Sequence, residues 1–263
     1  MITLNSVASN INTALPEPYA SLLNGIVWGI PLSHLPQLAQ LLKQAGIIHI
    51  AVLSGANITL LVSIISHITS KFSRNISIVI NMLLVIIFTS FVSLQAPVLR
   101  ASISAVLTYV AIMYGRKASA LYILLISGFI SCILFPSWLT SVSFQLSYGA
   151  TLGLVLFSFK SPFRNAFLSY CYEEIMCSLS AQIFTVPIIF FYFHQVSLIA
   201  PITNLLISWT IAPLMIMGFI ISFAGYVSPL LAFPFSIVAF VLMKWILLIT
   251  ETITKIPYSF IQL

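Results

Sequence analysis

The sequence predicts an all-α fold, a polytopic transmembrane helix bundle with about eight spans and an amphipathic N-terminal interfacial segment. Two observations support this prediction. Hydrophobic residues make up 60% of the 263 residues and charged residues only 5%, whereas a soluble domain carries about 25% charged residues. The apolar residues also form continuous runs near the length of about 20 residues that a helix needs to cross a bilayer. A transmembrane β-barrel would alternate apolar and polar residues instead.

The first 45 residues are the least apolar part of the chain. In the stretch PLSHLPQLAQLLKQAG, residues 31–46, leucines recur at helical spacing and are separated by Gln37, Gln40 and Lys43. This pattern is typical of an amphipathic helix that lies on a membrane surface. We therefore expect residues 1–45 to form an extracytoplasmic or interfacial segment and residues 46–263 to form the transmembrane domain.

Eight apolar runs follow this segment, and prolines mark several of their ends. Each run is about as long as one helical crossing of the hydrocarbon core. The predicted spans are residues 46–68, 75–94, 97–114, 118–135, 142–159, 173–193, 201–226 and 229–252.

Basic residues in the short loops predict how these spans are oriented. The loops after the first, third and fifth spans carry two each, whereas the loops near residues 95–96, 136–141 and 194–200 carry no lysine or arginine. The basic loop residues are Lys71, Arg74, Arg116, Lys117, Lys160 and Arg164. Because cytoplasmic loops are enriched in lysine and arginine, we expect these loops to be cytoplasmic and residues 1–45 to lie outside, in a multi-pass protein of the inner (plasma) membrane.

With this orientation, polar side chains from five of the predicted spans fall at one depth, near the outer surface. They are His49, Arg100, Gln145, Ser147, His194 and Asn204. Polar groups inside a membrane usually face a cavity or one another. Their shared depth therefore favours a polar path through the bundle.

Simpler roles remain open for most of these residues. Arg100 would snorkel to the outer headgroups, and His194 would anchor the interface. Gln145 and Asn204 would form hydrogen bonds between helices.

The stretch HIAVLSGANIT, residues 49–59, is unusually polar for a membrane span. Glycine destabilises a helix by about 1 kcal/mol relative to alanine. We therefore expect the helix to loosen at Ser54 and Gly55, with His49 and Asn57 facing the polar path. The alternative is that Ser54 and Gly55 only allow a neighbouring helix to approach closely.

The sequence gives little support for an enzyme. It contains no G-x-x-x-x-G-K-[ST] stretch for ATP, no histidine cluster and no aspartate. We therefore expect no cofactor, no metal ion and no catalytic residue. Ser54 and His49 would suggest an intramembrane serine hydrolase, but side chains five residues apart on one helix point about 140° apart.

Several stretches, in order along nearly the whole chain, resemble the competence domain of the ComEC DNA-uptake family. AGIIHIAVLSGANIT is similar to a G-x-x-H-x-x-A-x-S-G signature, and APVLRASISAVL resembles an R-A element at Arg100 and Ala101. SVSFQLSYGATLGL resembles an F-Q-L-S element that contains Gln145 and Ser147. The other similar stretches are LPEPYASLLNGIVWG, PIIFFYFHQVSLIAPITNLL with its P-x-x-N-L ending at Leu205, and KIPYSF.

The resemblance implies an inner-membrane channel through which single-stranded DNA enters during natural transformation. Together with the shared depth of the polar side chains, it predicts a path lined by His49, Ser54, Gly55, Asn57, Arg100, Gln145, Ser147, His194 and Asn204. It also implies that separate proteins bind the DNA, degrade the other strand and drive transport. The alternatives are a small-molecule or lipid transporter and, third, the intramembrane serine hydrolase.

The sequence departs from the family pattern in two ways. Many relatives have S-G-L-H where this chain has Ser54, Gly55, Ala56 and Asn57, so a role that needs an ionisable group at position 57 is not implied. These 263 residues also contain neither the oligonucleotide-binding-like domain nor the metallo-β-lactamase-like domain of full-length relatives.

Overall fold

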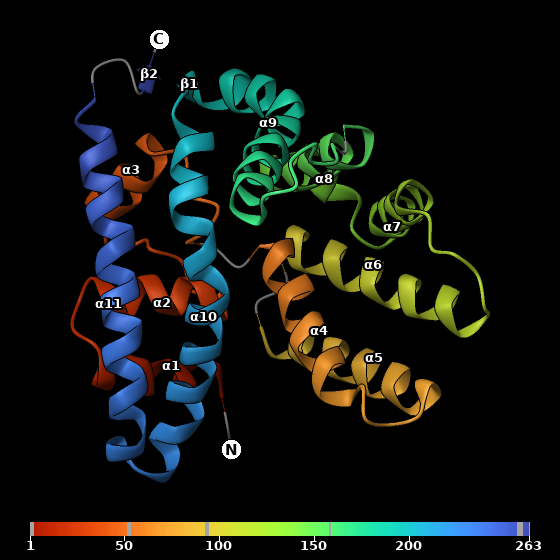
Figure 1. The fold of residues 1–263 in the computed structure, drawn as a ribbon, viewed down its shortest axis with the longest axis horizontal. Helices are drawn as coiled ribbons and strands as arrows, with labels where there is room; N and C mark the ends of the chain where they lie inside the picture. Colours follow the sequence, from red (N-terminus) through yellow and green to blue (C-terminus); the bar gives the residue numbers. More distant parts are fainter. Residues whose placement is uncertain (1–2, 52–53, 93–94, 158, 257–259, 263) are drawn as a thin grey trace. The chain divides into compact units, whose positions relative to one another are not determined.

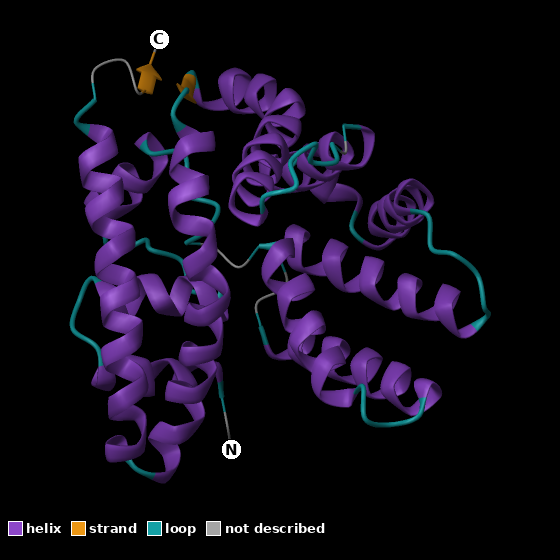
Figure 2. Ribbon diagram, viewed as in Figure 1, coloured by secondary structure: helices purple, strands orange, loops and turns teal. Residues whose placement is uncertain are grey.

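The computed structural model describes residues 3–51, 54–92, 95–157, 159–256 and 260–262 (Figure 1). In these ranges the chain forms eleven α-helices, one 3₁₀ turn and two short strands (Figure 2). The prediction of an all-α fold is therefore confirmed.

Five of the described helices are long and apolar enough to cross a membrane. They are α5 (Arg74–Phe91), α6 (Ala96–Met113), α9 (Ala166–Phe193), α10 (Ala200–Val227) and α11 (Pro229–Thr254). Three more apolar helices have 15 residues each: α4 (Gly55–Thr69), α7 (Ala120–Leu134) and α8 (Val142–Leu156). At 1.5 Å per residue a helix of that length covers about 22 Å, less than the hydrocarbon core of about 30 Å. A helix lies in each predicted span, but the number of eight spans is not confirmed.

The first predicted span begins too early. Its predicted start, Gly46, instead ends α3 (Pro36–Gln44), with a φ of 76°. The amide of Gly46 donates to the carbonyl of Lys43, and that of Ile47 donates to the carbonyl of Leu42. These two bonds form a Schellman motif, which stops a helix. Residues 47–51 continue as turns, and α4 begins only at Gly55.

The sixth predicted span begins too late. Its predicted start was residue 173, but α9 begins at Ala166. Glu173 therefore lies inside the helix, where its Oε1 accepts a hydrogen bond of 3.1 Å from Ser169 Oγ, one turn earlier. Because two charged residues stand at positions 173 and 174, the sequence pattern predicted the beginning of a membrane span at this point.

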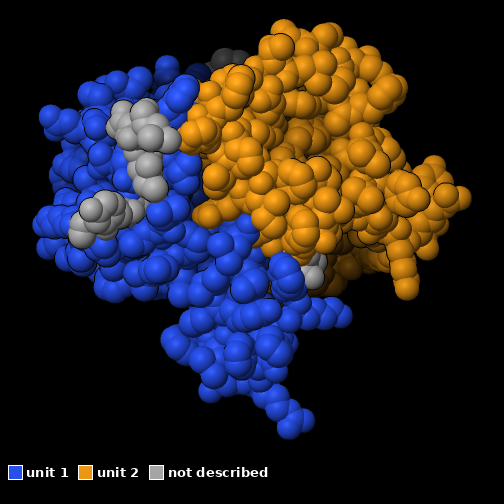
Figure 3. Space-filling view, turned by 90° about the horizontal axis from the view of Figure 1, so that it is seen from above, with its two compact units in different colours: residues 1–53, 159–179, 193–263 blue, residues 54–158, 180–192 orange. Residues whose placement is uncertain are grey.

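The chain divides into two compact units, coloured separately in Figure 3. The first unit contains residues 1–53, 159–179 and 193–263, and the second contains residues 54–158 and 180–192. Helix α9 is continuous and contributes to both.

The first unit is built on α10 and α11, which pack along each other (Figure 1). Helices α1 (Leu4–Ala14), α2 (Tyr19–Trp28) and α3 pack on this pair, and every residue of α2 from Ala20 to Trp28 is buried. Trp28 fixes α2 on α10, because its Nε1 donates to Ser222 Oγ at 2.9 Å. The interfacial position expected for residues 1–45 stays a prediction.

A short antiparallel ribbon completes the first unit. Strand β1 (Gln195–Ser197) pairs with β2 (Phe260–Gln262). The ribbon brings the described end of the chain to the turn between α9 and α10 and next to α3.

In the second unit, α4, α5 and α6 pack together, and α6 also contacts α7 and α8. A 3₁₀ turn (Pro136–Thr140) links α7 to α8. Gly153 lets α8 approach the second half of α9 closely, because a Cβ at this position would collide with the carbonyl of Ser180.

Candidate functional site

Arg100 is the centre of the candidate site in the second unit. It lies near the start of α6, and its side chain is half-buried. Its Nε donates to Ser147 Oγ on α8 at 2.8 Å. Its guanidinium carbon lies 5.8 Å from the centre of the Tyr148 ring, within the range of a cation–π interaction. Ser147 and Tyr148, which are neighbours on α8, therefore both contact the guanidinium of Arg100 on α6.

Gly55 makes room for this guanidinium at the start of α4. A Cβ at Gly55 would lie 2.5 Å from Arg100 Nη2 and 3.4 Å from the Cβ of Ala101. No side chain fits at the first of these distances without movement of the arginine. A side chain at this position would therefore displace the end of the Arg100 side chain, whereas its distance to Ala101 of α6 is that of an ordinary contact.

Ser54 and Asn57 form the N-terminal end of α4. Ser54 is the N-cap residue in extended conformation, and the amide of Asn57 donates to its carbonyl at 3.1 Å. Ser54 Oγ also donates to Asn57 Oδ1 at 3.3 Å. Asn57 is only 4% exposed. The sequence predicted that a continuous helix would loosen at Ser54 and Gly55, but in the structure a helix begins at this point.

The electrostatic environment of Arg100 is positive. No carboxylate forms an ion pair with it in the described ranges, which include all four glutamates of the chain. The N-terminal end of α4, which carries the positive end of a helix dipole, lies against the guanidinium at Gly55. A cation beside a positive helix end is unfavourable by itself, so this arrangement suits an anion.

Gln145 does not contribute to this cluster. Its Nε2 donates to the carbonyl of Leu139 at 3.1 Å. The side chain therefore joins α8 to the preceding 3₁₀ turn, although Ser147 is only two residues away on the same helix.

His49, His194 and Asn204 belong to the first unit, so the structure does not bring them into one unit with Arg100. His49 is exposed in the turns after α3, outside the helix in which it was predicted. His194 follows the last residue of α9, with a φ of 51°. Asn204 lies in α10, where its Nδ2 donates to Ser178 Oγ at 2.9 Å and its buried Oδ1 has no hydrogen-bond partner in the described residues.

Tyr148, an aromatic residue on which we expected the bases of a strand to stack, also supports the site through contacts with α7. The hydroxyl of Tyr148 lies 3.1 Å from Ser131 Oγ and 3.5 Å from Ser127 Oγ, both on α7. A Cβ at Gly128 would lie 3.3 Å from the Tyr148 ring. The small residues at 127, 128 and 131 were the available signal for a packed aromatic ring.

The sequence did not predict a second polar cluster that the structure contains. It joins α4, α5 and α6 through Asn81, which is 1% exposed. Asn81 Nδ2 donates to the carbonyl of Ser77 at 2.7 Å and to Thr69 Oγ1 at 3.0 Å, and Ser66 Oγ donates to Asn81 Oδ1 at 3.2 Å. Ser66 Oγ is also 2.9 Å from the hydroxyl of Tyr109. The helical spacing of residues 77 and 81 was the signal for this cluster.

The serine and histidine that the structure does bring together are not arranged for hydrolysis. Ser21 Oγ donates to Glu17 Oε1 at 2.7 Å and lies 2.8 Å from His34 Nε2. The serine therefore stands between the acid and the imidazole, whereas a triad needs the imidazole in the middle. In the described residues, no group of three or more His, Cys, Asp or Glu side chains could hold a metal ion.

Comparisons with known proteins agree with the resemblance seen in the sequence. The model of the family described as Competence protein matches residues 33–263. ComE operon protein 3 of Bacillus subtilis (strain 168) is 26% identical over 204 residues, which cover 76% of this chain and 26% of that protein. The match thus spans about a quarter of the relative. No solved structure matches the chain. With five long apolar helices and a family match over most of its length, the chain is a membrane protein with a competence-related role and belongs to the competence protein family.

Proposed function

We propose that this chain is a component of the inner-membrane channel through which single-stranded DNA enters the cell during natural transformation. Membership of the competence protein family supports this proposal. The observation that carries it is the Arg100 guanidinium, which is held by Ser147 and Tyr148 without a carboxylate partner in the described residues.

The chemistry of a DNA strand fits this group. Each nucleotide carries one phosphate charge, and the planar guanidinium offers five N–H donors that match phosphate oxygens. Ser147 accepts from the Nε donor, and no described residue accepts from the two Nη groups, which can therefore bind a ligand. The N-terminal end of α4 beside Arg100 adds to the attraction for an anion. A passing strand needs weak, repeated contacts of this kind rather than one tight site.

The basic loops support the proposed direction of transport. Lys71, Arg116 and Lys160 are all exposed, and they lie between α4 and α5, α6 and α7, and α8 and α9. On the cytoplasmic side they would receive the phosphates of the arriving strand. We propose that the partners are the DNA strand, the lipid bilayer and separate DNA-binding, nuclease and motor proteins.

The two alternatives have less support. Transporters with a closed site at the membrane midplane typically use discontinuous helices, whereas α9 and α10 continue through Pro187 and Pro213. A serine hydrolase needs a base on its nucleophile, whereas Ser54 Oγ donates to Asn57. We therefore propose a conduit rather than an enzyme.

The experiment is a measurement of internalised DNA in cells that lack the gene for this chain. Cells restored with the gene should accumulate one labelled strand in a nuclease-protected form, and cells without it should bind DNA only at the surface. Equal protected label in both strains would refute the proposal. Turnover of a lipid or a peptide that depends on the chain would favour one of the alternatives.

A further inference from the structure

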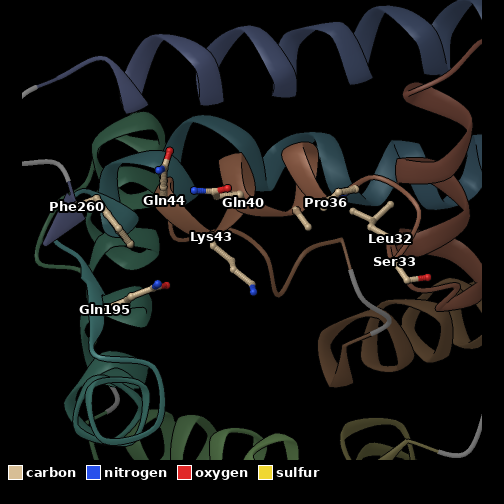
Figure 4. A pocket seen from close by; sticks show the side chains of 9 residues that line it. Leu32, Ser33, Pro36, Gln40, Lys43, Gln44, Gln195 and Phe260 are labelled. Carbon is tan, nitrogen blue, oxygen red and sulfur yellow. The ribbon is translucent and has the colours of Figure 1, made fainter. Parts of the chain in front are cut away.

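A polar cavity of about 430 Å³ lies in the first unit, and none of the residues predicted to line the path is among its lining residues. One wall is α3 with the turn before it, and the other is formed by the ribbon of β1 and β2 (Figure 4). The lining residues are Leu32, Ser33, Pro36, Ala39, Gln40, Lys43, Gln44, Gln195 and Phe260. Small-ligand sites commonly have volumes between about 300 and 1,000 Å³, so a group of the size of one nucleotide fits.

The cavity is formed by the polar face of the amphipathic helix α3. Leu42 on the opposite face is 1% exposed, whereas Gln40 and Lys43 are exposed. Figure 4 shows Lys43 and Gln195 extending into the same open space from α3 and β1. The polar face of this helix is therefore enclosed on one side by protein, which a helix resting only on a membrane surface would not need.

The polar groups around the cavity are not used by the protein itself. Ser33, Gln40, Lys43, Gln44 and Gln195 form no side-chain hydrogen bond or ion pair with any described residue. Lys43 is the only charged residue in the lining, so the cavity is positive. Phe260 adds one aromatic ring.

We propose that this cavity binds one nucleotide unit of single-stranded DNA, with Lys43 on the phosphate, the glutamine amides on the edge of the base and Phe260 stacked on its face. An ammonium group forms strong charge-assisted bonds with phosphate. A glutamine amide pairs with a base edge because it offers both a donor and an acceptor, and aromatic stacking is tolerant of sequence. A lipid headgroup would fit less well, because three amides and one cation suit a base better than a lone phosphate.

This inference rests on the proposed function and adds to it a contact at α3 and the β1–β2 ribbon. In the orientation predicted from the basic loops, α3 and the segment around residue 195 lie on the outer side, where the strand arrives. The cavity would then bind the strand on the outer side.

The test measures the affinity of the full chain, in lipid nanodiscs, for a short fluorescent oligothymidylate by fluorescence anisotropy. Lys43→Gln should weaken binding about tenfold, because one charge-assisted bond is lost. Lys43→Arg should stay within about threefold of the wild type. Phe260→Ala should weaken binding about tenfold through lost stacking, and Phe260→Tyr should not.

Lys255→Gln is the matched control, because Lys255 is exposed in the same unit and does not line the cavity. Equal effects of Lys43→Gln and Lys255→Gln would overturn the inference. The inference would also be overturned if short-chain phosphatidylglycerol bound at Lys43 and the oligonucleotide did not compete with it. If only Arg100→Gln weakens binding, the proposed function stands and the cavity has no part in it. If the wild type binds no oligonucleotide, both proposals fail.

Discussion

The Nε of Arg100 on α6 donates to the hydroxyl of Ser147 on α8 at 2.8 Å, across 47 positions of sequence. This contact connects two helices that also share the Tyr148 ring, and it fixes the direction in which the guanidinium points. A charge that is held by neutral groups keeps its full attraction for an anion, since no carboxylate pairs with it in the described residues.

The charge of Arg100 should control DNA uptake. Arg100→Glu should abolish internalisation of labelled strand, and Arg100→Gln should reduce it by about tenfold or more, because a charge-assisted bond to phosphate is lost. Arg100→Lys should keep part of the uptake, since the charge remains but the planar fork is lost. Lys244→Gln serves as the control, because Lys244 is exposed on α11 and belongs neither to the basic loops nor to the residues predicted to line the path. Normal uptake by Arg100→Gln at physiological salt would mean that Arg100 only anchors α6 at the headgroups.

Ser147 should act by positioning Arg100. Ser147→Ala removes the hydroxyl but keeps the charge, so we expect uptake to fall several-fold and its dependence on salt to remain. Ser147→Thr should restore most of the loss. Protein level and thermal stability should change little, because hydrogen bonds between membrane helices contribute about 0.6 kcal/mol on average. Uptake that is unchanged in Ser147→Ala would show that the orientation of the guanidinium has no influence.

Asn81 should stabilise the second unit. Asn81→Ala removes four hydrogen bonds, one each to Ser66 and Thr69 and two to Ser77, among groups that are buried or half-buried. We expect the free energy of unfolding in detergent to fall by about 1–2 kcal/mol. Asn75→Ala, at an exposed position of the same helix, should change it by less than about 0.5 kcal/mol. Equal stability of the two variants would argue against a structural role for this cluster.

The orientation of the protein can be tested by thiol labelling. In a background without Cys132, Cys171 and Cys177, single cysteines at positions 71, 116 and 160 should resist a membrane-impermeant reagent in intact cells. They should react after the membrane is permeabilised, since all three positions are exposed. Labelling of two of these positions from outside would reverse the orientation. The cavity beside α3 would then face the cytoplasm.

Hydropathy alone located a helix within every predicted span, because a continuous apolar run has few other structures available in a membrane. The beginnings of α4 and α9 were wrong for local reasons. The Schellman motif at Gly46 depends on one positive φ, which hydropathy does not report. Glu173 lies inside α9 and not at its end. Boundaries depend on single caps, whereas the presence of a helix depends on many residues.

The sequence predicts at what level along its span each site residue lies, which stays a prediction, but it does not predict the direction of the side chains. The sequence placed Arg100 and Ser147 at one level, and the structure joins them. It gave the same level to Gln145, whose amide instead bonds to the carbonyl of Leu139. Depth follows from position along a span, but the direction of a side chain depends on which helices pack together. The sequence of one chain contains no direct record of that packing.

Gly55 should be the most restrictive position of the site. A Cβ there would lie 2.5 Å from Arg100 Nη2, so even Gly55→Ala forces the guanidinium to move away from the start of α4. We expect Gly55→Ala to reduce uptake several-fold and Gly55→Leu to abolish it. The loss should come from displacement of Arg100, because Gly55 is the first residue of α4 and its replacement leaves the rest of the helix intact.

Ser63→Leu is the control for added bulk, because Ser63 is exposed on the same helix. It should leave uptake unchanged. Cysteines at positions 54 and 57 then distinguish a polar path from a packing contact. Reaction of either cysteine with a water-soluble reagent in the folded protein, and its protection by a bound oligonucleotide, would support a path for the strand. If both are protected without oligonucleotide, and Gly55→Leu still abolishes uptake, Gly55 acts only by allowing α4 and α6 to pack closely.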